Sequence, residues 1–196
     1  MRYQLASLIC FAVLFGFACD GFAAVTYDES VSGDVSNNPQ APTAINLALG
    51  TNSFIATMPG ADLDFFTINV PAGGQLSSLI MADYESIDEI SFIAIGAGTQ
   101  LPASILSYDP TGLLGYAHFG GELNIGNDLL ADLAIANFGV PGFDTPLPAG
   151  NYTFWLQQES TVATGYQLDF NVTPVPEPAT AALLVVASCG FAFRRR

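Results

Sequence analysis

The chain has 196 residues, 51% of them hydrophobic, and a formal net charge of −14 at pH 7. Its four Lys and Arg residues are Arg2 and Arg194 to Arg196. Of its 18 acidic residues only Asp20 precedes residue 25. Residues 25–178 therefore hold 17 carboxylates and no Lys or Arg. Such a surface repels phosphate and anionic surfaces, which excludes a nucleic-acid-binding protein. Its carboxylates must be solvated, accept hydrogen bonds in caps and turns, or bind cations.

Residues 1–24 are predicted to be a secretory signal peptide. Arg2 supplies the positive start, residues 5–17 form the apolar helix, and small residues precede a cut after Ala23. A lipoprotein alternative would use Cys19. The three cysteines, Cys10, Cys19 and Cys189, all lie near the two ends, so the segment between them carries neither a disulfide framework nor thiol chemistry.

Residues 25–173 are predicted to form one domain. The polar stretch 25–44 is expected to be irregular, and short apolar segments separated by Gly, Pro, Asn and Asp follow it. These lengths and separators predict an all-β sandwich of antiparallel strands. The candidate strands are 45–49, 53–57, 64–70, 76–82, 90–95, 113–119, 151–158 and 165–172.

Alternation along the last two candidate strands assigns their side chains to faces. One face carries the large residues Tyr152, Phe154, Leu156, Tyr166, Leu168 and Phe170. Trp155 points to the other side, which predicts a strand covered on both faces. Residues 127–134 begin with a cap residue and have apolar positions typical of one or two helical turns. Residues 137–150 are predicted to form a long ordered loop.

Residues 62–73 run Asp-Leu-Asp-Phe-Phe-Thr-Ile-Asn-Val-Pro-Ala-Gly. An Asp-x-Asp before an aromatic strand and a Pro-x-Gly turn resembles the core of the bacterial pre-peptidase C-terminal (PPC) domain. The acidic, Asn-rich stretch before it and the strand from Leu147 to Leu156 also fit. The resemblance implies a jelly-roll-like β-sandwich without catalytic activity, of a kind in which some members bind calcium or extracellular polymers.

A calcium site is one hypothesis for the acidic residues of this region. Asp62 and Asp64 flank one residue at a strand start, and Glu29, Asp34 and Asn37 lie in the loop-like N-terminal stretch. Ca²⁺ prefers several oxygen ligands from flexible loops. In the resembling family calcium lies between the N-terminal linker and this region. The alternative is that these residues only cap turns and keep the surface soluble.

Catalysis is not expected. Asp83, Glu85, Asp88 and Glu89 could act as paired acids on a glycoside, but a solvated loop is the ordinary interpretation. His118 is the only histidine, and no Gly-x-Ser-x-Gly elbow accompanies it. The protein is therefore predicted not to be an enzyme. Among the aromatic residues, Tyr84, Tyr108, Tyr116 or Trp155 could stack on sugars, although core packing is the alternative for each.

The last 23 residues, 174–196, have three parts. Pro176-Glu177-Pro178 keeps the backbone extended. The apolar run 179–193 would span roughly 22 Å as a helix, which is short of the ~30 Å hydrocarbon core. Arg194, Arg195 and Arg196 then hold the end on the cytoplasmic side. The run is predicted to be a transmembrane helix that holds the chain temporarily.

This order of parts resembles the PEP-CTERM sorting signal of exported proteins in Gram-negative, biofilm-forming bacteria. The resemblance implies processing by an exosortase-type membrane enzyme near Pro176-Glu177-Pro178. The sequence therefore predicts a non-catalytic exported protein that passes through the inner membrane to the cell surface or the extracellular polysaccharide matrix. A structural or adhesive role is expected there, and the alternative is a calcium-dependent carbohydrate- or polymer-binding module.

Overall fold

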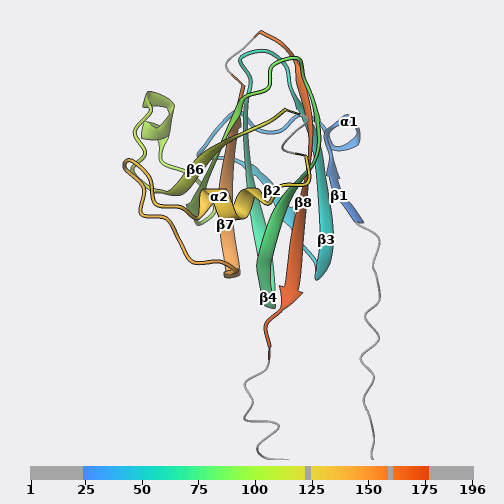
Figure 1. The fold of residues 1–196 in the computed structure, drawn as a ribbon, viewed down its shortest axis with the longest axis vertical. Helices are drawn as coiled ribbons and strands as arrows, with labels where there is room; N and C mark the ends of the chain where they lie inside the picture. Colours follow the sequence, from blue (N-terminus) through green and yellow to red (C-terminus); the bar gives the residue numbers. More distant parts are fainter. Residues whose placement is uncertain (1–23, 122–124, 159–160, 177–196) are drawn as a thin grey trace, which may run out of the picture.

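The computed structural model describes residues 24–121, 125–158 and 161–176, which form a β-sandwich (Figure 1). The helices are α1 (Glu29–Ser32), the 3-10 helix η1 (Ala103–Ser107) and α2 (Leu129–Leu133). The strands are β1 (Ala24–Asp28), β2 (Thr43–Asn46), β3 (Gly50–Met58), β4 (Leu63–Glu85), β5 (Ser91–Ala97), β6 (Leu113–Phe119), β7 (Leu147–Gln157) and β8 (Thr164–Pro174).

The strands are hydrogen-bonded in the order β1-β3-β8-β4-β7-β5-β6, with β2 added beside β4. The path folds into two layers because β4 belongs to both. Residues 63–70 of β4 pair with β2 and β7, and residues 74–85 pair with β8; Gln75 and Leu76, at the corner, also pair with β7. The first layer is β1, β3, β8 and the second half of β4. The second layer is β2, the first half of β4, β7, β5 and β6.

The chain turns from one layer to the other at residues 71–74 of β4. Gly73 has φ +78°, a conformation that favours glycine, and a Cβ on Gly74 would lie 3.0 Å from Val172 Cγ1. The similar segment Leu147-Pro148-Ala149-Gly150 lies directly opposite, with Gly150 paired to Val70 and Leu147 to Leu76. The two Pro-Ala-Gly segments thus meet at one corner of the sandwich.

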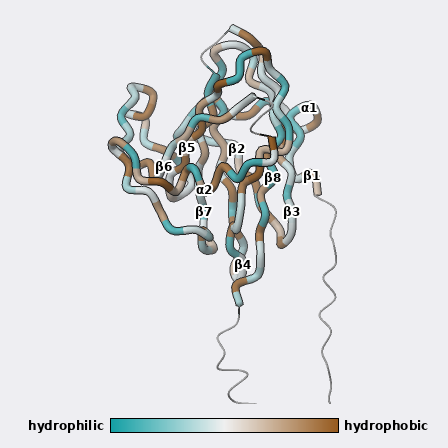
Figure 2. Tube along the Cα trace, in the orientation of Figure 1, coloured by the Kyte–Doolittle hydropathy of each residue, from teal (hydrophilic) through white to brown (hydrophobic). Residues whose placement is uncertain are grey.

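The main core lies between the two layers. Phe54 of β3 stacks on Phe66 of β4 with ring centroids 4.3 Å apart, and Phe66 stacks on Phe154 at 5.3 Å. Hydrophobic and hydrophilic residues alternate along the strands, as the colours in Figure 2 show. The predicted inward set, Tyr152, Phe154, Leu156, Tyr166, Leu168 and Phe170, is confirmed, since all six side chains are buried in this core.

A second, smaller hydrophobic cluster lies on the outside of the second layer. Its buried members are Phe65, Ala94, Leu101, Ile105, Leu113, Val140 and Trp155. Trp155 therefore faces away from the main core, and the prediction of a strand covered on both faces is confirmed. The cover consists of the segment around η1 and the loop around Val140.

Helix α2 closes one side of the sandwich, beside β6 and the second half of β4 (Figure 1). Its N-cap is Asp128, whose Oδ1 accepts from the N–H groups of Leu130 and Leu79, at 3.0 and 2.9 Å. Leu129, Leu130 and Leu133 are buried in the main core. The short helix predicted at residues 127–134 is confirmed.

The prediction of irregular structure is confirmed for residues 33–42 and was wrong for residues 25–32, which lie in β1 and α1, and for residues 43–44, which begin β2. The prediction of antiparallel pairing was wrong for two pairs of strands. β1 pairs with β3 and β2 pairs with β4, and both pairs are parallel. The stretch is polar because only one side chain in each short edge strand is buried, Tyr27 in β1 and Ile45 in β2. The predicted strands 64–70 and 76–82 are two halves of one strand, β4.

Residues 1–23 of the predicted signal peptide (1–24) lie outside the described residues, whereas Ala24 begins β1. Glu177, Pro178, residues 179–193 and Arg194 to Arg196 also lie outside the described residues. Pro176, the last described residue, is exposed. Within the part of the chain that the structure describes, no helix is long and apolar enough to cross a membrane.

Candidate functional site

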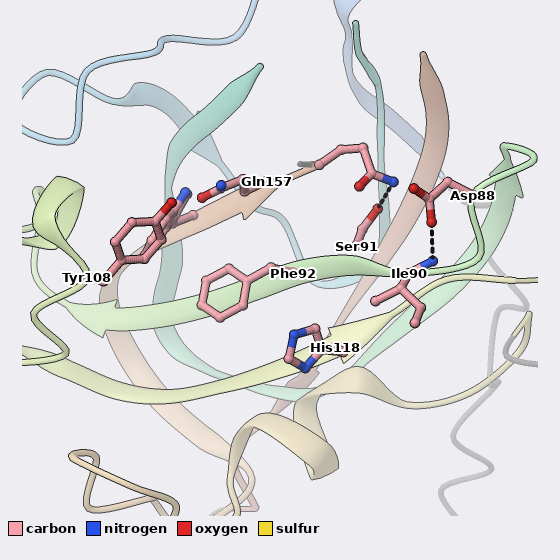
Figure 3. Close-up of a pocket in the computed structure, with 9 residues that line it drawn as sticks. Asp88, Ile90, Ser91, Phe92, Tyr108, His118 and Gln157 are labelled. Carbon is pink, nitrogen blue, oxygen red and sulfur yellow. Dashed lines mark hydrogen bonds between the residues drawn. The ribbon is translucent and has the colours of Figure 1, made fainter. Parts of the chain in front are cut away.

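An elongated cleft lies on the outer face of the second layer, where β5, β6 and β7 run side by side (Figure 3). It consists of two adjoining cavities of about 380 and 170 Å³ that share Phe92, Tyr108 and Trp155. The larger volume falls within the ~300–1,000 Å³ of small-ligand sites. We call it the aromatic cleft, after its six ring-bearing residues Phe92, Tyr108, Tyr116, His118, Phe138 and Trp155.

Strand register places the rings that β5, β6 and β7 contribute in two outward-facing rows. Across the three strands Ala94 stands opposite both Trp155 and Tyr116, so a small residue separates two large rings. Phe92 stands in the next outward-facing row, opposite Gln157 and His118. Side chains two residues apart on a strand share a face, so these rows line one surface.

The rings of the cleft contact one another around Phe92. Its centroid lies 4.8 Å from that of Trp155 in an edge-to-face arrangement, and 5.9 Å from that of Tyr116 in a stacked one. The His118 ring meets Phe92 edge-on at 5.9 Å. Such contacts are among the preferred geometries of aromatic pairs and fix the walls of the cleft before any ligand arrives.

Two further rings project from the cover. Tyr108, which follows η1, is 73% exposed and has φ +58°, and Phe138 is 85% exposed. A non-glycine residue in the left-handed region costs roughly 1–2 kcal/mol, and such strain clusters at functional sites. Figure 3 shows Tyr108 and Asp88 at opposite ends of the larger cavity, with Phe92 and His118 between them.

Trp155 carries an unsatisfied hydrogen-bond donor. The residue is only 4% exposed, yet its indole Nε1 has no acceptor among the described residues. An unmade hydrogen bond of this kind costs about 1–3 kcal/mol. Trp155 lines both cavities of the cleft, so a ligand oxygen that reached the indole would remove part of that cost.

The structure selects among the four aromatic residues proposed from the sequence. Tyr84 is buried, and its hydroxyl donates to Asp88 O at 2.8 Å, so it is not available to a ligand. Tyr108, Tyr116 and Trp155 all line the aromatic cleft. Phe92 and Phe138 were missed. Phe92 occupies an outward position of β5, whereas nothing in the sequence distinguishes Phe138 from other loop residues.

The acidic cluster around Tyr84 is divided between sites. Asp88 lines the aromatic cleft, and its Oδ1 accepts from the Ile90 N–H at 3.3 Å. Glu89 lines a neighbouring cavity together with His118. Asp83 and Glu85 are exposed residues of β4. His118 is itself exposed on β6, in contact with Phe92.

Most of the proposed calcium ligands do lie near one another. Ser36 of the N-terminal segment bridges to Phe65, which brings that segment beside the start of β4. The pKa of the Asp64 carboxyl is raised to about 8, mainly by burial. The hydrogen bond from the Tyr166 hydroxyl lowers this pKa, and the charges of Asp62, Glu29 and Asp34 contribute to raising it. Asn37 is exposed on the same segment.

Their arrangement does not form a coordination shell. Asp64 is fully buried; Oδ2 accepts from Tyr166 Oη at 2.6 Å, whereas Oδ1 has no partner among the described residues. Glu29 uses one oxygen for the Val35 N–H and the other for Thr57. Across residues 24–121, 125–158 and 161–176, no three His, Cys, Asp or Glu side chains are placed to hold a metal ion. The calcium hypothesis stays a prediction.

The other side of the sandwich is built differently. A cavity of about 410 Å³ beside β3 is lined by residues that include Asp28, Glu29 and Asp34, and no aromatic residue belongs to its lining. The outer face of β3, β8 and the second half of β4 carries Thr51, Asn171 and Ser78 in one row, joined by hydrogen bonds of 2.6 and 2.8 Å. Ser53 donates to Asp169 in the adjacent row at 2.6 Å. These side chains satisfy one another and leave a polar surface.

The comparisons with known proteins assign no family to the chain. No protein-family model matches the sequence, and no curated protein matches it.

Proposed function

We propose that this protein is a non-catalytic exported protein that binds extracellular polysaccharide at the cell surface or in the surrounding matrix. The single observation that carries the proposal is the aromatic cleft. It combines ring faces with polar groups at its edge, the chemistry that stacks on the apolar faces of sugar rings while bonding their hydroxyls. Adhesion to the matrix follows from such binding.

Export and sorting are part of the same proposal. The apolar leader of residues 1–24 and the Pro-Glu-Pro, apolar and arginine order of residues 174–196 support passage through the inner membrane and processing by an exosortase-type enzyme. The finer fold assignment, a jelly-roll-like sandwich of the PPC kind, is likewise proposed. The corner in β4 after the Asp62-x-Asp64 segment supports it.

Binding is tested by titrating the purified protein with soluble polysaccharides and following tryptophan fluorescence. Trp155 is the only tryptophan in the chain and lines the cleft, so its emission reports occupancy of this site. Tyr108→Ala and Phe138→Ala each remove an exposed ring and should weaken binding about tenfold or more. Val31→Ala removes an exposed side chain on α1 and is the matched control. Equal binding by all three variants would refute the site.

Sorting is tested separately, by cell fractionation and intact mass. Replacing Pro176-Glu177-Pro178 with alanines should leave a longer form in the inner membrane. If mass and location are both unchanged, the sorting half of the proposal is wrong, whatever the cleft binds.

A calcium requirement is the second candidate, favoured by the carboxylates that surround Asp64. Millimolar Ca²⁺ in place of EDTA should then raise the melting temperature by several degrees, and Asp62→Asn should abolish the rise. An unchanged melting curve for the unmodified protein excludes calcium from the function.

A further inference from the structure

The charge of the molecule restricts what the aromatic cleft can hold, if the proposed polysaccharide binding is right. Residues 25–178 contain no Lys or Arg. A uronate or sulfated sugar entering the cleft would find no basic side chain of this domain other than His118, and would meet the field of 17 carboxylates. Acidic polysaccharides are therefore disfavoured at this site.

Two of those carboxylates belong to the cleft itself. Asp88 lines the larger cavity and Asp109 the smaller one. Asp109 follows Tyr108, and hydrogen bonds from the Thr111 hydroxyl and N–H lower the pKa of its carboxyl. Negative charge is thus placed beside the rings of both cavities.

The rings favour the same sign of charge. The face of an aromatic ring is the negative part of its quadrupole and attracts ammonium groups. Tyr108 and Phe138 are largely exposed, so their faces are open to a ligand. A ligand with apolar ring faces and ammonium groups would use both features of the cleft, whereas a neutral sugar would use only the first.

We propose that the aromatic cleft preferentially binds polymers of amino sugars whose amines are free and protonated, with Asp88 and Asp109 pairing the ammonium groups and the rings stacking on the sugars. This inference rests on the proposed polysaccharide binding and adds the ligand's charge class. The elongated shape, with Tyr108 and Asp88 at opposite ends in Figure 3, suits consecutive units of a chain.

The test compares three oligosaccharides of equal length: glucosamine oligomers, their N-acetylated counterparts and an oligouronate. Trp155 fluorescence is followed at mildly acidic pH, where the amines are protonated. Glucosamine oligomers should bind about tenfold more tightly than the acetylated ones, and added salt should erase most of the difference because it screens the charges. The oligouronate should show no saturable binding.

Substitutions locate the effect. The double variant Asp88→Asn, Asp109→Asn should bring the glucosamine affinity down to that of the acetylated oligomers and leave the latter unchanged. Asp132→Asn, an exposed acid of α2 away from the cleft, should alter neither affinity.

The outcomes separate this inference from the proposed function. If acetylated oligomers bind as tightly as glucosamine oligomers and Tyr108→Ala weakens both, the cleft binds sugars and the charge preference is wrong. If the preference survives in the double variant, diffuse attraction elsewhere on the acidic surface causes it and the inference is overturned. If no oligosaccharide changes the fluorescence, both proposals are wrong.

Discussion

The two outer faces of the sandwich are both built from β-strands, but they carry different kinds of side chains. The face of β3, β8 and the second half of β4 carries short polar side chains that bond to one another, as Thr51 does to Asn171 at 2.6 Å. The face of β5, β6 and β7 carries Phe92, Tyr116 and Trp155 and lies under the cover around η1 and Val140. The cavity of about 380 Å³ on this second face is lined by aromatic rings, whereas the cavity of about 410 Å³ beside β3 has no aromatic residue in its lining.

Residues 25–178 contain no Lys or Arg, and the two faces differ in how their side chains pack and bond without such partners. On the polar face hydroxyls and amides satisfy the carboxylate of Asp169 without any ion pair. On the covered face the fully buried Ala94 stands between Trp155 and Tyr116, and the rings of Phe92, Tyr116 and Trp155 line the aromatic cleft.

The largest effect should come from the layer between the two faces. Phe66 is fully buried and stacks on both Phe54 and Phe154. Phe66→Ala should lower the free energy of unfolding by about 3–5 kcal/mol, measured by urea denaturation. Tyr108→Ala, which removes an exposed ring, should stay within about 0.5 kcal/mol of the unmodified protein. Comparable losses in both variants would mean that the cleft is part of the folding core rather than an appendage.

Much of this comparison could be predicted from the sequence. The sequence around Trp155 revealed a strand with two buried faces, because a large aromatic residue stands where simple alternation would place a polar one. The expectation that acids serve as caps is confirmed at Asp28 and Asp128, which cap α1 and α2.

The rest depended on contacts between distant segments. The parallel edge strands β1 and β2 are held by pairing with β3 and β4. The sequence of β1 gave no strand signal, and only the last two residues of β2, 45–46, fall within a predicted strand. Phe138 joins the cleft only because its loop folds back beside Tyr116, whose hydroxyl donates to Phe138 O at 3.3 Å. Such long-range placement leaves no local pattern.

A second test concerns Asp64, a carboxyl buried inside the sandwich rather than on either face. Burial raises its pKa to about 8, so the folded state keeps a proton that the unfolded chain releases near pH ~4. The folded state then binds more protons between these values, and stability should fall as the pH rises, by up to ~1.4 kcal/mol per pH unit, with no further loss above about pH 8.

Asp64→Asn should flatten this slope, because the amide is neutral throughout. Urea denaturation at several pH values from 4 to 9 measures it, and near pH 4 the variant should lie within about 1 kcal/mol of the unmodified protein. A slope that persists in the variant would assign the pH dependence to other groups. If Ca²⁺ binds here, it should favour the ionised carboxylate and reduce the slope of the unmodified protein.

The smallest effects compare one threonine from each face. Thr153 of β7 is fully buried; its hydroxyl donates to Gly98 O at 3.0 Å and lies 2.7 Å from that of Thr67. Thr153→Val would leave the carbonyl at the start of the η1 cover without this donor and should cost about 1–3 kcal/mol. Thr51→Val removes one hydrogen bond on the polar face, where water can replace it, and should cost about 0.5 kcal/mol.

If Thr51→Val costs as much as Thr153→Val, the polar face is not open to water. If Thr153→Val also weakens ligand binding while Thr51→Val does not, the Gly98 contact holds the loop that presents Tyr108, and the covered face owes its binding site to that anchorage.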